Sequence, residues 1–509
     1  MGLRDFTLFD VIERNAQLYG DRLAFVADGQ RVSHREYAQR VERLASGMAG
    51  IGLVAGDRVA VLAQNCLAFV ELYGAAARLG LIVVPVNWRL SAEEIAYVIT
   101  DTQPRVIIAG EEFQDVIEGK SASFSFVERY FSLGAARGAY AAFDTLTRAG
   151  SITPAADVSG ASGFVILHTA AVGGRPRGAL LSHAGFLAAN MQLAATWKLS
   201  EQDVHLALLP LFHVAALSIM LAAQQVGGAS VLLPRFDAPA ALEAIRSERV
   251  SGFIEFAPIL SMLLDAAAKD GGDLSSLRHV TGLDSPETIT RFEVACPSAC
   301  FWVMYGQSET TGVATIARFR DRPGSAGMPA LLNRVAVVDD QDQALPIGQA
   351  GEIVVRGPMV FNGYWNCAAD NEVTFRNGWH HTGDMGRFDD DGYLWYSGRS
   401  PEKELIKPGG ENVYPAEVER ALLDHPAVAE AVVFGVPDAQ WGEAIKAVCV
   451  CRPGQTVAAA ELIEFVATRL ARFKRPKQVV FTAALAKNAQ GQLDRARVKR
   501  EFADKRADA

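Results

Sequence analysis

The segment of residues 168–178, HTAAVGGRPRG, has the setting of a phosphate-binding loop. A short apolar run precedes it and a helix-like stretch follows it. A strand, a glycine-containing turn and a helix together commonly direct backbone N–H groups at a phosphate. The segment carries one hydroxyl, on Thr169, and no lysine, so it is not a Walker A motif. Taken alone it predicts either an ordinary turn or a phosphate cradle with few side-chain donors.

A second group of candidate residues lies in the segment 304–312, MYGQSETTG, at the end of the strand-like run CFWVM. Ligand sites of open α/β sheets lie at the carboxyl ends of the strands. There Tyr305 could stack on a purine, Ser308 could hydrogen-bond a phosphate, and Glu309 could bind Mg²⁺ through a carboxylate oxygen. The alternative for the same residues is a capped turn that binds nothing.

Three further residues are candidates, each with a structural alternative. Asp384 lies between two glycines, where its carboxylate could accept hydrogen bonds from both hydroxyls of a ribose; it could equally be a turn aspartate. Arg399 suits a phosphate or ribose clamp at a domain junction, or a simple turn. His213 is flanked by apolar residues and is either a core histidine or a site residue.

The bulk composition predicts a soluble cytoplasmic protein of at least two domains. A chain of 509 residues is too long for one core, and a net charge of −9 argues against nucleic acid or an anionic membrane as the main partner. The longest apolar stretches are shorter than the roughly 20 residues that span a bilayer. The first 20 residues read as an amphipathic helix and not as a signal peptide. Six cysteines without a CxxC pair predict reduced thiols.

Elements that could position these residues alternate along the chain. Between residues 32 and 109, and again between 203 and 303, buried-strand runs alternate with helical patterns, which predicts parallel sheets with helices on their faces. From 333 to 397 short β runs indicate a small antiparallel or barrel-like subdomain, and a compact α+β unit follows residue 399. The predicted fold class is therefore α/β, with a large N-terminal domain and a small α+β C-terminal domain.

Several segments, in this order, resemble one family: residues 56–102, YGQSE at 305–309, HTGDMGRFDDDGYLWYSGR at 381–399 and IKPGGENVYPAEVE at 406–419. Over essentially its whole length the chain resembles the adenylate-forming (acyl-CoA synthetase, AMP-binding) superfamily, and within it the fatty-acid or aryl acid–CoA ligases. The resemblance implies a ligase that makes an acyl-AMP and pyrophosphate from an acid and ATP, then passes the acyl group to CoA. It implies an N-terminal domain at 1–398, a hinge at 399–403 and a mobile C-terminal domain at 404–509.

The resemblance also implies roles for individual residues. Tyr305 would stack on adenine, Ser308 would contact the α-phosphate, Asp384 would bind the ribose hydroxyls and Arg399 would lie on the ribose or phosphate. The full set of implied nucleotide contacts is Thr169, Gly174, Arg177, Tyr305, Gly306, Gln307, Ser308, Asp384 and Arg399. The implied catalytic residues are His213, where the acid meets ATP, Glu309, which would hold Mg²⁺, and position 492; Lys403 would be the hinge residue, and Gly409 and Gly410 would line the CoA tunnel. The implied partners are ATP, Mg²⁺, CoA and a small carboxylic acid, with no nucleic acid or membrane span, and a homodimer is the assembly considered.

Two departures from the family pattern fall on its chemistry. The family's phosphate loop reads roughly TSGTTGxPKG; here Ala170, Val172 and Gly173 replace central hydroxyl or polar positions, and Arg177 replaces the lysine. Near the C-terminus the family reads LPKTxxGKxxR, but here Gln492 stands at the lysine that bridges the acid and the α-phosphate. Losing one such donor costs on the order of 10²–10³ in rate. The hinge also has two extra residues before Lys403.

Two hypotheses therefore remain open. One is a working acid–CoA ligase with unusual motifs; the other is a homologue that binds nucleotide or acyl-adenylate, or runs only the thioester half-reaction. Apolar residues after His213 and at 253–258 favour an apolar acyl or aryl pocket. Glu255 and Asp284 complicate that prediction. If Asp284 faces the pocket, a polar or amine-bearing acid fits better than a plain fatty acid, since an unpaired buried carboxylate is costly.

Overall fold

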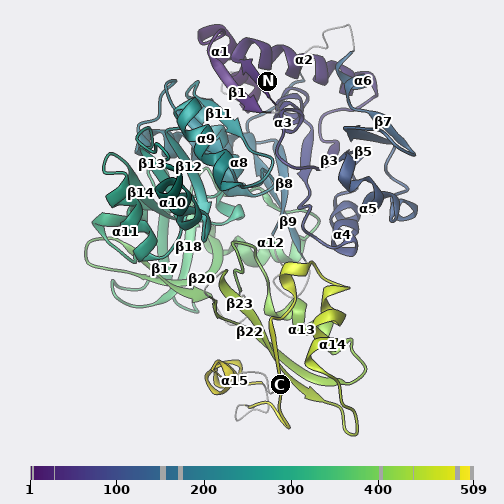
Figure 1. Cartoon of the computed structure of the whole chain (residues 1–509), viewed down its shortest axis with the longest axis vertical. Helices are drawn as coiled ribbons and strands as arrows, with labels where there is room; N and C mark the ends of the chain where they lie inside the picture. The colour runs from purple at the N-terminus through teal and green to yellow at the C-terminus, as the bar shows by residue number, and fades with distance from the viewer. Residues whose placement is uncertain are drawn as a thin grey trace. The chain divides into compact units, whose positions relative to one another are not determined.

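The computed structural model divides into two compact units, which are described separately (Figure 1). The larger unit holds residues 1–88, 98–168 and 178–397, and the smaller holds 89–97, 169–177 and 398–509. The structure describes residues 2, 5–27, 29–148, 156–169, 176–399, 405–438, 441–487 and 493–504.

The larger unit is built on three sheets. The first has the strand order β16 (Met328–Pro329), β15 (Thr315–Arg318), β14 (Cys300–Tyr305), β13 (His279–Leu283), β12 (Gly252–Phe256), β10 (Val204–Ala207), β11 (Ala229–Leu232), β1 (Leu23–Ala27) and β2 (Gln30–Ser33). The second has the order β19 (Gly363–Tyr364), β9 (Arg177–Ser182), β8 (Gly163–Thr169), β4 (Ile82–Pro85), β3 (Arg58–Leu62), β5 (Val106–Gly110), β6 (Arg129–Leu133) and β7 (Tyr140–Ala142). The third has the order β17 (Arg334–Val338), β18 (Gly351–Arg356), β20 (His380–Phe388) and β21 (Leu394–Arg399).

The helices that alternate with these strands are α1 (Leu8–Leu18), α2 (His34–Gly50), α3 (Leu67–Leu79), α4 (Ala92–Thr102), α5 (Gln114–Glu118), α6 (Asp144–Thr147), α7 (His183–Trp197), α8 (Val214–Gln225), α9 (Ala238–Glu248), α10 (Ile259–Asp270), α11 (Pro286–Ala295) and α12 (Ala368–Thr374). In the first sheet, β1 and β10 through β14 pair in parallel, as the alternation of strand and helix patterns predicts. The amphipathic helix predicted near the N-terminus is α1. A capping box precedes α4, with reciprocal hydrogen bonds between Ser91 and Glu94.

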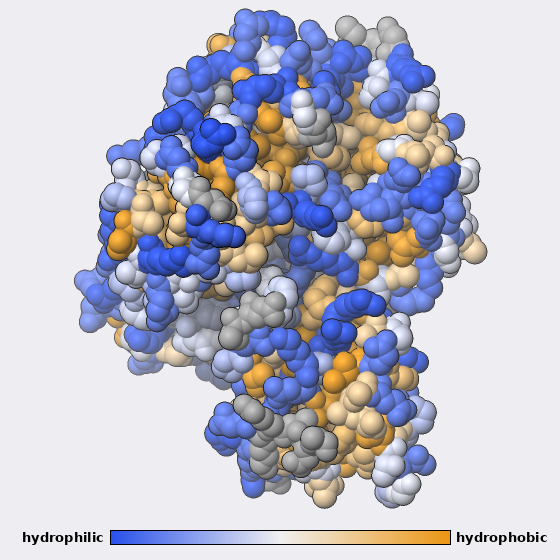
Figure 2. Space-filling view, in the orientation of Figure 1, coloured by the Kyte–Doolittle hydropathy of each residue, from blue (hydrophilic) through white to orange (hydrophobic). Residues whose placement is uncertain are grey.

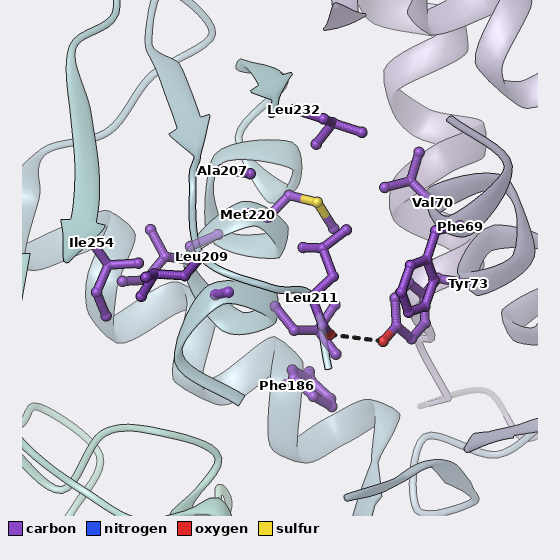
Figure 3. Close-up of a cluster of buried hydrophobic side chains, with 14 of the residues drawn as sticks. Phe69, Val70, Tyr73, Phe186, Ala207, Leu209, Leu211, Met220, Leu232 and Ile254 are labelled. Atoms are coloured by element: carbon purple, nitrogen blue, oxygen red, sulfur yellow. Dashed lines mark hydrogen bonds between the residues drawn. The ribbon is translucent and has the colours of Figure 1, made fainter. Parts of the chain in front are cut away.

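A buried cluster joins α3 to the segment that follows β10 (Figure 3). The rings of Phe69 and Tyr73 stack with centroids 5.2 Å apart, and the Tyr73 hydroxyl donates a hydrogen bond of 3.0 Å to the carbonyl of Leu211. This bond satisfies the polar end of an otherwise buried ring. The cluster fixes the stretch 208–212, which leads from β10 to His213 at the start of α8.

The smaller unit has its own core around a three-stranded sheet with the order β22 (Val428–Asp438), β23 (Gly442–Cys451) and β24 (Gln478–Phe481). Its helices are α13 (Pro415–Leu423), α14 (Ala459–Ala467) and α15 (Arg495–Phe502). The predicted mixed α/β class, a large domain of parallel sheets with a smaller domain after it, is confirmed.

The surface mixes polar and apolar residues, which are interspersed on the face shown in Figure 2. Among the residues that the structure describes, every helix is too short or too polar to cross a membrane. The six cysteines, all among the described residues, form no disulfide bond with one another.

Candidate active site

The site begins where β14 ends at Tyr305. The chain folds back tightly after this residue: Gly312 donates its backbone N–H to the Gln307 carbonyl, and Ala314 donates to the Tyr305 carbonyl. A Cβ on Gly306 would lie 2.4 Å from the Gly312 carbonyl oxygen, so this close approach of two backbone segments requires glycine. The fold-back presents the side chains of the segment at the carboxyl end of the sheet, the edge at which open α/β folds bind ligands.

Tyr305, Gln307 and Asp384 form one hydrogen-bonded cluster. The Tyr305 hydroxyl donates to Oδ2 of Asp384 at 2.8 Å, and the Gln307 side-chain amide donates to the same oxygen and to the carbonyl of Thr382. Asp384 is 1% exposed, so both donors act on a carboxylate removed from bulk water. Hydrogen bonds to a charged group stabilise by roughly 1.5–3 kcal/mol each, and these two fix the orientation of the carboxylate.

Strand β20 positions Asp384 through its neighbour Thr382. The Thr382 hydroxyl donates to the carbonyl of Ile353 on β18 and accepts a hydrogen bond from the backbone N–H of Asp384. Gly383 lies between them with φ +70°, a backbone conformation that glycine adopts readily. The sequence GD in HTGDMG therefore turns the carboxylate toward β14.

Glu309 is held by a residue of a distant segment. It is 7% exposed, and its Oε1 accepts a hydrogen bond of 2.7 Å from the hydroxyl of Tyr364. A carboxylate is a ligand type that Mg²⁺ prefers, and the predicted role fits this residue in its chemistry. Among the described residues no cluster of three or more His, Cys, Asp or Glu side chains could hold a metal ion.

His213 precedes α8, and this helix packs on the segment of Tyr305. The hydroxyl of Ser218 in α8 donates to the carbonyl of Thr311 at 3.0 Å. A Cβ on Gly312 would contact Val214, the first residue of α8. The half-buried His213 is therefore carried by an element that touches the segment containing Glu309.

Two family models match the sequence of this chain. Residues 12–365 match the model described as AMP-binding enzyme, and residues 417–492 match the model described as AMP-binding enzyme C-terminal domain. The chain belongs to the AMP-binding enzyme family. The predicted resemblance is thereby confirmed.

Several of the similar proteins are acid–CoA ligases. An indoleacetate–CoA ligase from Aromatoleum aromaticum is 35% identical over 96% of both chains. A solved structure from Rhodopseudomonas palustris, provisionally assigned as a long-chain-fatty-acid CoA ligase, is 52% identical over 78% of this chain and all of its own, with a TM-score of 0.76. The o-succinylbenzoate CoA synthetase MenE from Bacillus subtilis, solved with a product analogue, is 28% identical over 99% of both chains, with a TM-score of 0.85. Acid–CoA ligases of this family use a carboxylic acid, ATP and CoA.

Of the remaining predicted residues of this AMP-binding enzyme, Ser308 begins the short helical turn Ser308–Thr310 in the larger unit, and the others fall in the smaller unit or outside the described residues. Arg399 donates a hydrogen bond of 2.7 Å to the Tyr414 hydroxyl. Thr169 donates to the backbone carbonyl of Arg177 at 3.4 Å. Gly409 and Gly410 both have positive φ. Three predicted residues, Gly174, Lys403 and Gln492, lie outside the described residues, as do the altered loop positions 170–173.

Sequence reasoning missed two residues of the larger unit that hold the predicted ones. Tyr364 supports Glu309, and the ring of His380 lies 3.4 Å from the side-chain oxygen of Gln307. Both are buried. The only signal for Tyr364 was a tyrosine after a glycine in FNGYWN, which does not predict a partner.

Proposed function

We propose that this protein activates a carboxylic acid with ATP and transfers the acyl group to CoA. A carboxylate oxygen of the acid attacks the α-phosphorus of ATP, and pyrophosphate leaves. The sulfur of CoA then attacks the acyl carbon, and AMP leaves. The observation that supports this best is the hydrogen-bonded cluster in which Tyr305 and Gln307, on the same fold-back as Glu309, both donate to Asp384 of β20.

Within this proposal each group of residues has a task. The ring of Tyr305 stacks on adenine, and Asp384, held by the Tyr305 hydroxyl and the Gln307 amide, accepts hydrogen bonds from ribose. Glu309 holds Mg²⁺, which when bound neutralises phosphate charge. Ser308, Thr169, Gly174 and Arg177 contact the phosphates, Arg399 contacts the ribose or phosphate, and His213 lies where the acid meets ATP. Residues 404–509 act as the mobile domain, hinged at 399–403 with its pivot at Lys403, and bring Gly409 and Gly410 to CoA.

We further propose that the first half-reaction is slow. Gln492 can donate hydrogen bonds but cannot neutralise the negative charge that develops on the phosphoryl group. Loss of one preorganised donor lowers rates on the order of 10²–10³. The loop changes act on the same step, and such losses are seldom additive. The alternative, a homologue that binds acyl-adenylate or performs only thioester transfer, rests on the same residues.

The experiment compares the natural enzyme with Gln492→Lys and Gln492→Ala. ATP–pyrophosphate exchange across fatty, aromatic and short-chain acids measures the first half-reaction, and thioester formation from synthetic acyl-AMP and CoA measures the second. We expect Gln492→Lys to raise exchange at least tenfold, Gln492→Ala to change it little, and neither to alter thioester formation. A gain below tenfold would refute the slow first step. Failure of both half-reactions in every variant would refute the ligase.

The acid that we expect is one with an apolar body. The residues after His213 that begin α8 are small and apolar, and residues 253–258 are largely apolar. The related indoleacetate–CoA ligase is named for an aromatic acid. We expect an aryl or alkyl acid as the substrate class of this protein.

A further inference from the structure

Two carboxyl groups lie at the carboxyl ends of neighbouring parallel strands in the larger unit. Glu255 is the penultimate residue of β12, and Asp284 directly follows β13. In the register between these strands, Glu255 pairs with Gly282, two residues before Asp284. Gly282 has φ +146°, and a Cβ there would overlap the backbone carbonyl oxygen of Glu255 and approach its Oε1 to 3.0 Å. The close approach of the two strands therefore requires glycine, and the Glu255 carboxyl lies beside it.

In the part of the chain that the structure describes, three of the four oxygens of these carboxyls lack the partners that buried carboxyls normally have, whereas Oδ1 of Asp284 accepts a hydrogen bond from the backbone N–H of Ser285. Glu255 is fully buried, and among the described residues neither of its oxygens has a hydrogen-bond partner of normal geometry; the same holds for Oδ2 of Asp284. Burial and the nearby Asp284 raise the pKa of Glu255 well above its usual range, and the backbone N–H of Leu260 opposes this only in part. Burial likewise raises the pKa of Asp284. An unpaired carboxyl in such a place is costly, so it calls for an explanation.

The register places Glu255 on the sheet face of the candidate site. Residues that pair across parallel strands share a face, and side chains alternate along a strand. Glu255 pairs with Gly282, Gly282 pairs with Val303, and Tyr305 is two residues beyond Val303. Glu255 and Tyr305 therefore belong to the same face, at the edge where ligands bind.

We infer that Glu255 and Asp284 bind an ammonium group carried by the acid substrate, so that this enzyme selects amine-bearing acids. The inference rests on the proposed function and names its substrate class. Three oxygens without partners, two on Glu255 and one on Asp284, match the three N–H donors of a primary ammonium. The positive charge of the ammonium also favours the ionised form of Glu255, which burial disfavours in the free protein.

The test uses the full-length protein and acyl-sulfamoyl adenosines, which mimic acyl-AMP and need no adenylation. One series carries unbranched ω-ammonium acids of increasing length and 4-(aminomethyl)benzoate. Each is paired with the analogue that has CH₃ in place of NH₃⁺. Calorimetry gives both dissociation constants for every pair. The variants are Glu255→Gln and Asp284→Asn, and Glu287→Gln is the control because this carboxyl lies near Asp284 but is exposed.

We expect at least one ammonium analogue to bind about tenfold or more tightly than its CH₃ partner. Glu255→Gln should remove about tenfold of this preference without weakening the CH₃ analogue, Asp284→Asn should reduce it, and Glu287→Gln should leave it unchanged. The inference is overturned if no ammonium analogue is preferred, or if Glu255→Gln leaves the preference intact. It is also overturned if both variants weaken every analogue equally, which would mean that the carboxyls contact the adenosine. Binding by no analogue at all would instead refute the proposed function.

Discussion

Replacing Glu255 by glutamine should stabilise the free protein, and more so as the pH rises. The substitution keeps the shape of the side chain and removes its titration. Because burial raises the pKa of Glu255 above that of an unfolded glutamate, the folded state holds the proton more tightly. Between those two pKa values the folded chain binds more protons than the unfolded one, and its free energy of unfolding falls as the pH increases.

The size of the effect follows from this linkage. An unfolded glutamate has a pKa of about 4.3, and each pH unit above it costs about 1.4 kcal/mol while the pH remains below the folded pKa. From pH 5 to pH 7 the wild type would lose as much as about 2.7 kcal/mol relative to the Glu255→Gln variant. Asp284 is the charged group that raises the pKa of Glu255 further, so Asp284→Asn should reduce this dependence.

Calorimetry at pH 5, 6, 7 and 8 measures the difference in the free energy of unfolding between the wild type and the Glu255→Gln variant. The transition to follow is that of the larger unit. The exposed Glu287→Gln should give no pH-dependent difference from the wild type. If Glu255→Gln lowers the unfolding temperature by the same amount at every pH, then the carboxyl has a stabilising partner in the free protein. The account of an unpaired carboxyl, and with it the ammonium site, would then be wrong.

Two other substitutions test the packing around the predicted residues. Tyr364→Phe removes the hydrogen bond to Glu309 and should raise the Mg²⁺ concentration for half-maximal pyrophosphate exchange about tenfold, with unfolding almost unchanged; an unaltered Mg²⁺ dependence would exclude a positioning role for Tyr364. The ammonium of Lys474 lies 2.7 Å from the buried carboxyl of Glu417, and Lys474→Met removes this cation. The substitution should destabilise the smaller unit by about 3–5 kcal/mol, measured by calorimetry. A loss below about 1 kcal/mol would mean that the ion pair contributes little to stability.

The sequence predicted the parts of this molecule that depend on local pattern. Alternating strand and helix runs predicted the parallel sheets, and the segments around Tyr305 and Asp384 were predicted as candidate sites, which the structure joins by a hydrogen bond. It did not predict Tyr364 or His380, because each contacts a site residue more than 50 positions away and neither lies in a periodic pattern. Such supporting contacts are set by tertiary packing, which single-sequence patterns do not contain.

The sequence also did not predict on which face of the sheet the Glu255 side chain lies, for a different reason. Whether a strand residue faces a site depends on register, and a shift of one residue moves every side chain to the other face. The pairing of Glu255 with Gly282 decides this question, and the position requires glycine because a Cβ there would overlap the backbone carbonyl oxygen of Glu255.

In the proposed reaction, substrate choice and adenylation rate would rest on different residues. Gln492 and the altered loop would act on the charge that develops on the α-phosphate, whereas Glu255 and Asp284 would act on a distal group of the acid. A buried carboxyl that lowers the stability of the free protein is expected to persist where a ligand needs it, since active sites often trade stability for function. The ammonium preference should therefore be measurable by binding even when adenylation is slow. Restoring a lysine at position 492 should then speed the reaction without changing which acid is chosen.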